Sequence, residues 1–123
     1  MPKKTILVVD NKPDILEFLQ KRLESQDYQV ITASDGVEGL KKAISQEIDL
    51  VLLDIAMPKK DGFAMLKELK SQEATKDIQV IIVSAKRETK SILEGQNLGS
   101  FDYFLKPFNF EELIKHIKRC VWS

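Results

Sequence analysis

Leu50-Val51-Leu52-Leu53-Asp54-Ile55-Ala56-Met57-Pro58 joins a short apolar run to an acid and a proline. Four consecutive apolar residues are typical of a strand that is buried on both faces of a sheet. Pro58 prevents this strand, or a helix, from continuing cleanly. The run therefore presents Asp54 at the carboxyl edge of a sheet, which is where open α/β sheets bind ligands. We expect Asp54 to be the reactive group and the other elements to position it.

The rest of the chain repeats this strand pattern and alternates it with helical patterns. Strands are expected at residues 5–9, 28–33, 49–53, 78–83 and 101–105. Apolar residues recur at helical spacing at 15–23, 37–44, 63–69 and 110–121, and more weakly at 88–97. The first, third and fourth strands are the most apolar, so we expect them at the centre of the sheet and the other two at its edges.

Five strand–helix units in strict alternation predict a doubly wound parallel sheet with helices on both faces. The strand order 2-1-3-4-5 places the apolar strands centrally with right-handed crossovers. This is the flavodoxin-like (βα)5 arrangement, with a topological switch between the first and third strands. We expect one domain over residues 1–123, because 123 residues form one ordinary core and no linker interrupts them.

Composition restricts the class of protein further. Nineteen basic and nineteen acidic residues cancel, so bulk charge gives no reason to expect nucleic acid or an anionic membrane as a direct partner. The single cysteine, Cys120, excludes an intrachain disulfide and fits a reducing compartment. No apolar run approaches the roughly 20 residues that span a bilayer. The start, Met-Pro-Lys-Lys-Thr, does not read as a secretory signal, so we expect a cytoplasmic protein.

Polar side chains follow four strands of the predicted sheet at the point where each strand ends. The first strand leads to Asp10 and Asn11, the third to Asp54, the fourth to Ser84 and the fifth to Lys106. In the order 2-1-3-4-5 these four strands are neighbours. We therefore expect the five side chains to share one pocket.

Acids at one sheet edge suggest a metal site. Buried carboxylates repel each other and any incoming phosphate, and a hard cation such as Mg²⁺ relieves both repulsions. Mg²⁺ keeps several waters, so few protein ligands suffice. We expect those ligands to be Asp54, an oxygen from Asp10 or Asn11, and a backbone carbonyl near Ala56. The lone histidine, His116, lies among charges and is expected at the surface, without a phosphoryl role.

The chemistry that this pocket suggests is phosphoryl transfer. Asp54 could attack phosphorus and become an aspartyl phosphate. Lys106 and the Ser84 hydroxyl would then hold the phosphoryl oxygens and stabilise their charge.

The chain resembles the receiver domain of two-component response regulators, of the chemotaxis-regulator type, along nearly its whole length. The matching segments are 6–13, 52–58, 61–62, 83–85 and 103–108. The resemblance implies that Asp54 is the phosphoacceptor, Lys106 the phosphate-contacting lysine and Ser84 the switch hydroxyl. It also implies that Tyr103 is the aromatic residue whose rotamer follows the switch, and that the carbonyl of Ala56 binds the metal.

The resemblance also implies partners. Receivers of this family take their phosphoryl group from a phosphohistidine of a sensor histidine kinase or a histidine phosphotransfer protein. They catalyse their own phosphorylation and dephosphorylation, and we expect no other enzymatic activity. The signal leaves through the face made by the fourth helix, fifth strand and fifth helix, which contacts a downstream protein or an output domain.

One position departs from the family pattern. The family usually has two acids after the first strand, and the second of them is the direct Mg²⁺ ligand, whereas here it is Asn11. A neutral amide oxygen can still coordinate, so we expect weakened Mg²⁺ binding. The substitution leaves open a phosphate-independent interaction module.

Two enzyme or cofactor-binding alternatives fit the sequence less well. An aspartate-nucleophile phosphatase needs a second acid close behind Asp54, and Ile55-Ala56-Met57 stands there instead. A flavodoxin-type cofactor binder needs a Gly/Ser/Thr-rich loop after the first strand, where this chain has Asp-Asn-Lys-Pro-Asp.

Overall fold

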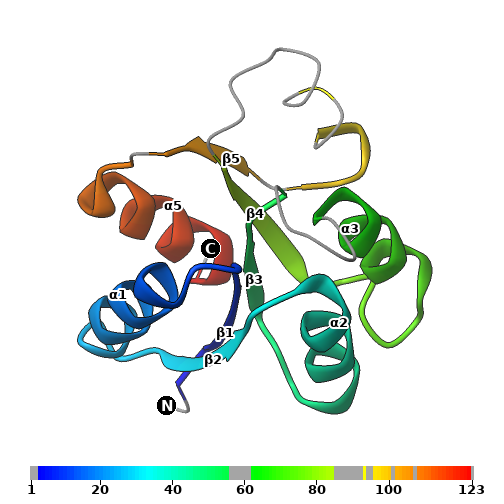
Figure 1. Ribbon diagram of the computed structural model, residues 1–123, viewed down its shortest axis with the longest axis horizontal. Helices are drawn as coiled ribbons and strands as arrows, with labels where there is room; N and C mark the ends of the chain where they lie inside the picture. The colour runs from blue at the N-terminus through cyan, green and yellow to red at the C-terminus, as the bar shows by residue number, and fades with distance from the viewer. Residues whose placement is uncertain are drawn as a thin grey trace.

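The computed structural model describes residues 3–55, 62–84, 93, 96–100, 102–106 and 108–122. Its elements, in chain order, are β1 (Thr5–Val9), α1 (Pro13–Glu24), β2 (Gln29–Ala33), α2 (Gly36–Ser45), β3 (Leu50–Leu53), α3 (Gly62–Ser71), β4 (Gln79–Ser84), β5 (Asp102–Leu105) and α5 (Phe110–Trp122) (Figure 1). The weak helix predicted at 88–97 falls mostly outside the described residues. No helix in the described ranges is both long and apolar enough to cross a membrane.

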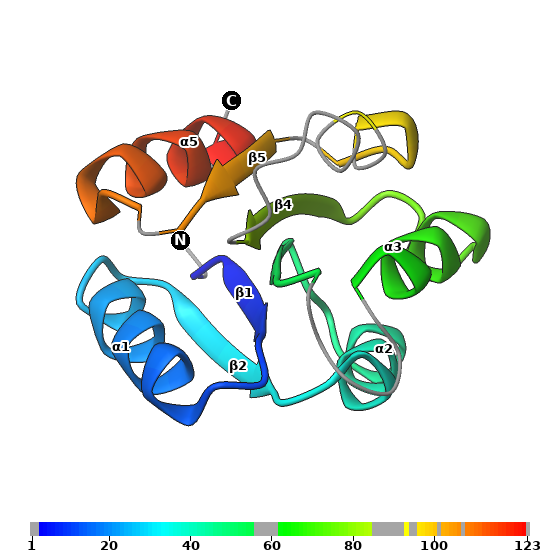
Figure 2. The same cartoon turned by 45° about the horizontal axis from the view of Figure 1, so that its top comes forward.

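The five strands form one parallel sheet in the order β2-β1-β3-β4-β5, which confirms the predicted topology. Figure 2 shows β1 beside β2, with β4 and β5 toward the other edge. Every residue of β1 and β3 is buried, whereas β5 is only partly buried and β2 has a single buried residue. The central and edge strands are therefore those expected from their apolar content.

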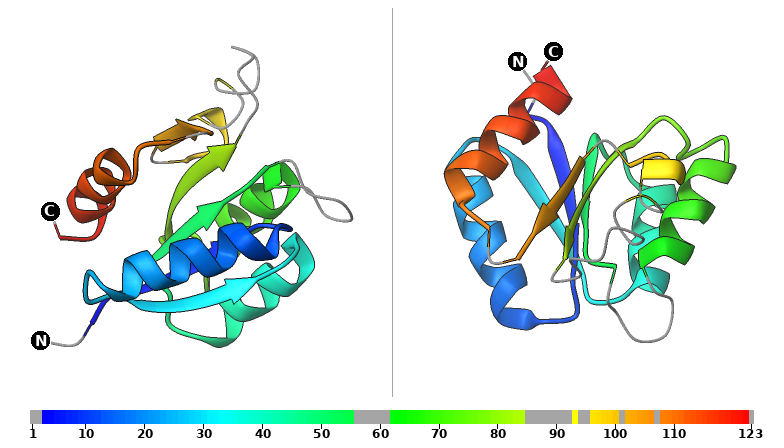
Figure 3. Two further views of the ribbon diagram at one scale, coloured as in Figure 1. Left: turned by 60° about the vertical axis from the view of Figure 1, so that its left-hand side comes forward. Right: turned by 90° about the horizontal axis from the view of Figure 1, so that it is seen from above.

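Helices cover both faces of the sheet. Helices α1 and α5 pack on one face, and α2 and α3 pack on the other (Figure 3). Neighbouring residues of β1 alternate between these layers: Ile6 packs toward α1 and α5, and Leu7 toward α2 and α3. This alternation follows from the two-residue period of a strand, and it explains why the central strands are apolar throughout.

Helix α2 confirms the helix predicted from the spacing of apolar residues at 37–44. Its buried residues are small ones, Gly36, Gly39 and Ala43, while Val37 is 42% exposed and Ile44 is 46% exposed. A Cβ on Gly39 would lie 2.9 Å from Met65 Cε, so the absence of a side chain allows α2 to approach α3 closely. Close packing between the two helices therefore depends on small residues and not on the large apolar ones.

Candidate functional site

Three predicted site residues each stand one position beyond the end of a strand. Asp10 follows β1, Asp54 follows β3 and Lys106 follows β5. The backbone N–H of each donates to the last carbonyl of a neighbouring strand: Asp10 to β2 at 3.1 Å, Asp54 to β1 at 3.0 Å and Lys106 to β4 at 2.9 Å. These bonds extend the sheet ladder by one residue, so the three side chains start from the same edge in fixed register.

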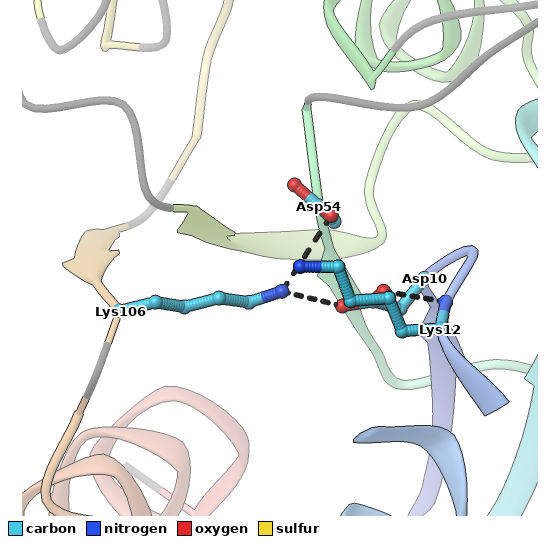
Figure 4. Close-up of polar contacts among 4 residues, drawn as sticks. All are labelled: Asp10, Lys12, Asp54 and Lys106. Atoms are coloured by element: carbon cyan, nitrogen blue, oxygen red, sulfur yellow. Dashed lines mark hydrogen bonds and ion pairs between the residues drawn. The ribbon is translucent and has the colours of Figure 1, made fainter. Parts of the chain in front are cut away.

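The side chains of these residues form a buried ion cluster. Lys106 Nζ lies 2.7 Å from Asp10 Oδ2 and 3.5 Å from Asp54 Oδ2. The side chains of Lys106, Asp10 and Asp54 are only 14%, 4% and 6% exposed. Figure 4 shows Lys106 reaching from the β5 end of the sheet to the two carboxylates. One cation thus compensates two buried anions, and the cluster keeps a formal charge of −1.

Asp10 is oriented by the start of α1. Its Oδ1 accepts a hydrogen bond from the backbone N–H of Lys12 at 3.0 Å, while its Oδ2 contacts Lys106. Both carboxylate oxygens are therefore engaged. Asn11 is exposed, and its side chain makes no hydrogen bond within the described part of the chain.

Gly62 packs against the backbone of Asp54 and Ile55. Its backbone N–H donates to the carbonyl of Ile55 at 3.2 Å. A Cβ at this position would lie 2.6 Å from the carbonyl oxygen of Asp54 and 2.3 Å from the Cα of Ile55. Only glycine permits so close an approach, and the alternative is a displaced Asp54 backbone. The sequence carries no signal for this contact beyond the glycine itself.

The remaining predicted residues lie near the cluster or outside the described residues. Ser84 is the last residue of β4, is fully buried, and its carbonyl accepts the bond from the backbone N–H of Lys106. Tyr103 lies within β5, is partly buried and packs against the core on the α2 and α3 side. Ala56 falls outside the described residues. The sheet edge thus brings together Asp10, Asp54, Lys106 and the end of β4.

The donor set of the cluster suits a hard divalent cation. Carboxylate oxygens of Asp10 and Asp54 converge on one positive group, and both residues are at least 95% buried. The described residues hold no group of three or more acidic, histidine or cysteine ligands. Mg²⁺ does not require such a group, because it binds one or two carboxylates and fills its octahedron with water and phosphate oxygens.

Comparison with known proteins identifies relatives that cover nearly the whole chain. The family profile described as "Response regulator receiver domain" matches residues 6–118. The chain is 42% identical over 115 residues to the "Alkaline phosphatase synthesis transcriptional regulatory protein PhoP" of Bacillus subtilis, covering 94% of this chain and 47% of that protein. The chain spans about half the length of the curated relatives that it matches.

Solved structures agree with this likeness. The Vibrio cholerae chemotaxis protein CheY4 superposes with a TM-score of 0.90 at 30% identity, over 96% of this chain and 98% of that one. The response regulator protein TrrA of Thermotoga maritima, solved in complex with Mg(2+)-BeF, superposes with a TM-score of 0.85 at 38% identity, over 95% and 98%.

Proposed function

Because the chain belongs to the response regulator receiver domain family, we propose that Asp54 accepts a phosphoryl group from a phosphohistidine of a partner protein. The donor is a sensor histidine kinase or a histidine phosphotransfer protein, and the reaction takes place in the cytoplasm. The ion cluster of Asp10, Asp54 and Lys106 is the observation that supports this proposal most strongly, because it sets a nucleophilic carboxylate beside a fixed cation.

The transfer follows from the positions of these groups. A carboxylate oxygen of Asp54 forms a bond to phosphorus while the phosphorus–nitrogen bond of the donor breaks, and the bonding electron pair stays on the imidazole. Lys106 is anchored to Asp10 at 2.7 Å, and its ammonium lies 3.5 Å from Asp54. It can therefore neutralise the phosphoryl oxygens as the bond to Asp54 forms, without a large rearrangement.

Mg²⁺, when bound, neutralises the charge that two carboxylates and a phosphoryl group bring together. We infer that Asp10 and Asp54 hold it, with the amide oxygen of Asn11 and the backbone carbonyl of Ala56 as further ligands. The TrrA complex with Mg(2+)-BeF, at 38% identity, supports Mg²⁺ as the metal that this chain binds. Because Asn11 is neutral, this chain should bind Mg²⁺ more weakly than a receiver with an acid there.

The signal leaves the site through Ser84 and Tyr103. The burial of Ser84 beside the Lys106 backbone supports a hydroxyl that moves toward the phosphoryl group. Tyr103, partly buried in the neighbouring strand, would turn inward in response. Phosphorylation would bias this two-state equilibrium and alter the face that includes β5 and α5, which contacts a downstream protein or an output domain. Residues 86–96, which the resemblance assigns to the same face, lie mostly outside the described residues.

Intact-mass measurement after treatment with a small phosphodonor tests the proposal. The wild-type protein should gain one phosphoryl group in the presence of Mg²⁺ and less in chelator, and Asp54→Asn should gain none. Asp49→Asn is the matched control, because it removes the same charge at the opposite edge of the sheet. Full labelling of a folded Asp54→Asn protein would exclude Asp54 as the acceptor.

A phosphate-independent interaction module is the second candidate, and Asn11 is the residue that favours it. In that case the folded wild-type protein would gain no phosphoryl group under any metal condition. Asn11→Asp would then be expected to restore phosphorylation, since it adds back the missing carboxylate.

A further inference from the structure

Lys12 places a second lysine at the ion cluster. Its backbone N–H is fixed to Asp10 Oδ1 at 3.0 Å, so its Cα stands beside the buried carboxylates. In Figure 4 the Lys12 side chain crosses in front of Asp10, and in this view its ammonium overlies the Lys106–Asp54 ion pair. Among the residues that the structure describes, none forms a hydrogen bond or ion pair with that ammonium. The charge is therefore available to an incoming group.

The Lys12 side chain does not stabilise the helix that it begins. Lys12 is the N-cap residue of α1, and its side chain makes no capping hydrogen bond. Ser, Thr, Asp and Asn are the residues that stabilise a helix from this position. A positive side chain at a helix N-terminus is also disfavoured by the helix dipole. The lysine thus weakens the start of α1 while it adds charge to the site.

The charge of Lys12 complements the missing acid at Asn11. Asp10, Asp54 and Lys106 together carry a formal charge of −1, and Lys12 brings the cluster to zero. An acid in place of Asn11 would instead make the same set negative. A neutral site repels a phosphate less and attracts a divalent cation less than a negative one does.

We propose that Lys12 binds the phosphoryl oxygens of the incoming donor and partly replaces Mg²⁺ in phosphorylation of this receiver. The inference rests on the proposed function of Asp54. Lys12 neither makes nor breaks a covalent bond, so the transfer from donor to Asp54 is unchanged. Its ammonium contacts the donor phosphoryl oxygens, while Lys106, anchored to Asp10, neutralises the group as it reaches Asp54. The consequence is a receiver that keeps part of its phosphorylation rate when Mg²⁺ is removed.

The test compares wild-type protein with Lys12→Gln by two measurements. The first is the rate of phosphorylation by a small acyl phosphate, in Mg²⁺ and in chelator, followed by intact mass. The second is the Mg²⁺ dissociation constant in the absence of any phosphodonor, measured by calorimetry. Lys12→Gln should lower the rate in chelator by about fivefold or more and tighten Mg²⁺ binding by about three- to tenfold. Damage to the fold would weaken both, so the opposite signs exclude a merely structural effect.

Two controls accompany this variant. Lys12→Arg keeps the charge and should resemble the wild-type protein in both measurements. Lys3→Gln removes an exposed lysine before β1 and should change neither, because it lies at the other end of that strand.

Each outcome decides the proposal. The inference is overturned by a Lys12→Gln protein that differs from wild type in neither measurement or in only one, and by wild-type phosphorylation that stops completely in chelator. In those cases phosphorylation in Mg²⁺ leaves the proposed function intact. A wild-type protein that accepts no phosphoryl group from any donor overturns the proposed function and this inference together.

Discussion

The two edges of the sheet use charged side chains in opposite ways. At the carboxyl edge, Asp10 and Asp54 are buried and share Lys106. At the amino edge, Asp49 is exposed, and its Oδ2 accepts a hydrogen bond from the backbone N–H of Thr5 at 2.8 Å. Charges at the carboxyl edge interact with one another, whereas this charge at the amino edge satisfies backbone that would otherwise lack a partner.

Lys70 repeats the amino-edge pattern. It lies near the end of α3, and its Nζ donates to the backbone carbonyl of Ile78 at 2.8 Å, just before β4 begins.

Burial also affects two titratable groups away from the ion cluster. It lowers the pKa of Lys70 and raises the pKa of Cys120 to about 11. The thiol is therefore protonated and unreactive at neutral pH. At the amino edge, Asp49 and Lys70 thus satisfy backbone groups, whereas at the carboxyl edge the buried charges of Asp10, Asp54 and Lys106 lie beside one another.

Removing the shared cation should have the largest effect. Lys106→Met removes the ion-pair partner that two buried carboxylates share, and we expect a loss of about 3 kcal/mol in the free energy of unfolding. Phosphorylation should be lost as well. In an Asp54→Asn background the same change should destabilise less, because only Asp10 remains charged. Urea unfolding of the four proteins at pH 7 measures this coupling, and equal losses in both backgrounds would contradict a shared ion cluster.

The second-largest loss of stability is expected from a change at Gly62, which packs against the backbone of Asp54. Gly62→Ala forces a Cβ to within 2.6 Å of the carbonyl oxygen of Asp54, so the backbone has to move. We expect a loss of about 2 kcal/mol in the free energy of unfolding and slower phosphorylation. Gly39→Ala is the matched control, because the atoms nearest to its Cβ belong to the side chains of Met65 and Val9, whereas the Gly62 Cβ meets the backbone of Asp54 and Ile55. Similar phosphorylation rates for both variants would remove Gly62 from the site.

Much of the fold could be predicted because the strands are uninterrupted apolar runs. The first strand was expected at residues 5–9, and β1 spans Thr5–Val9. The convergence of Asp10, Asp54 and Lys106 also followed from topology alone, since parallel strands end at a common edge. Asp35 and Asn109 cap α2 and α5 as their residue types suggest.

The features that could not be predicted from the sequence are contacts between separate elements of the fold. Lys106 lies nearer to Asp10 than to Asp54, and no pattern in the chain indicates that preference. The buried face of α2 and the contact of Gly62 both depend on a missing side chain, which hydrophobic periodicity does not register. His116 was expected at the surface, yet it is half-buried, edge-on to Phe104 and bonded to Asp102. Both contacts come from β5, and the sequence around His116 gives no indication of them.

At the amino edge the effect should be smallest and confined to stability. Asp49→Ala removes the acceptor for the Thr5 N–H, and we expect a loss of about 1 kcal/mol in the free energy of unfolding. Asp49→Asn keeps an oxygen acceptor and should lose less, which separates the hydrogen bond from the charge. Phosphorylation should stay at the wild-type level in both variants, since the change lies at the far end of the strands. A drop in phosphorylation without a drop in stability would mean that the two edges are coupled, and the division of labour between them would then have to be abandoned.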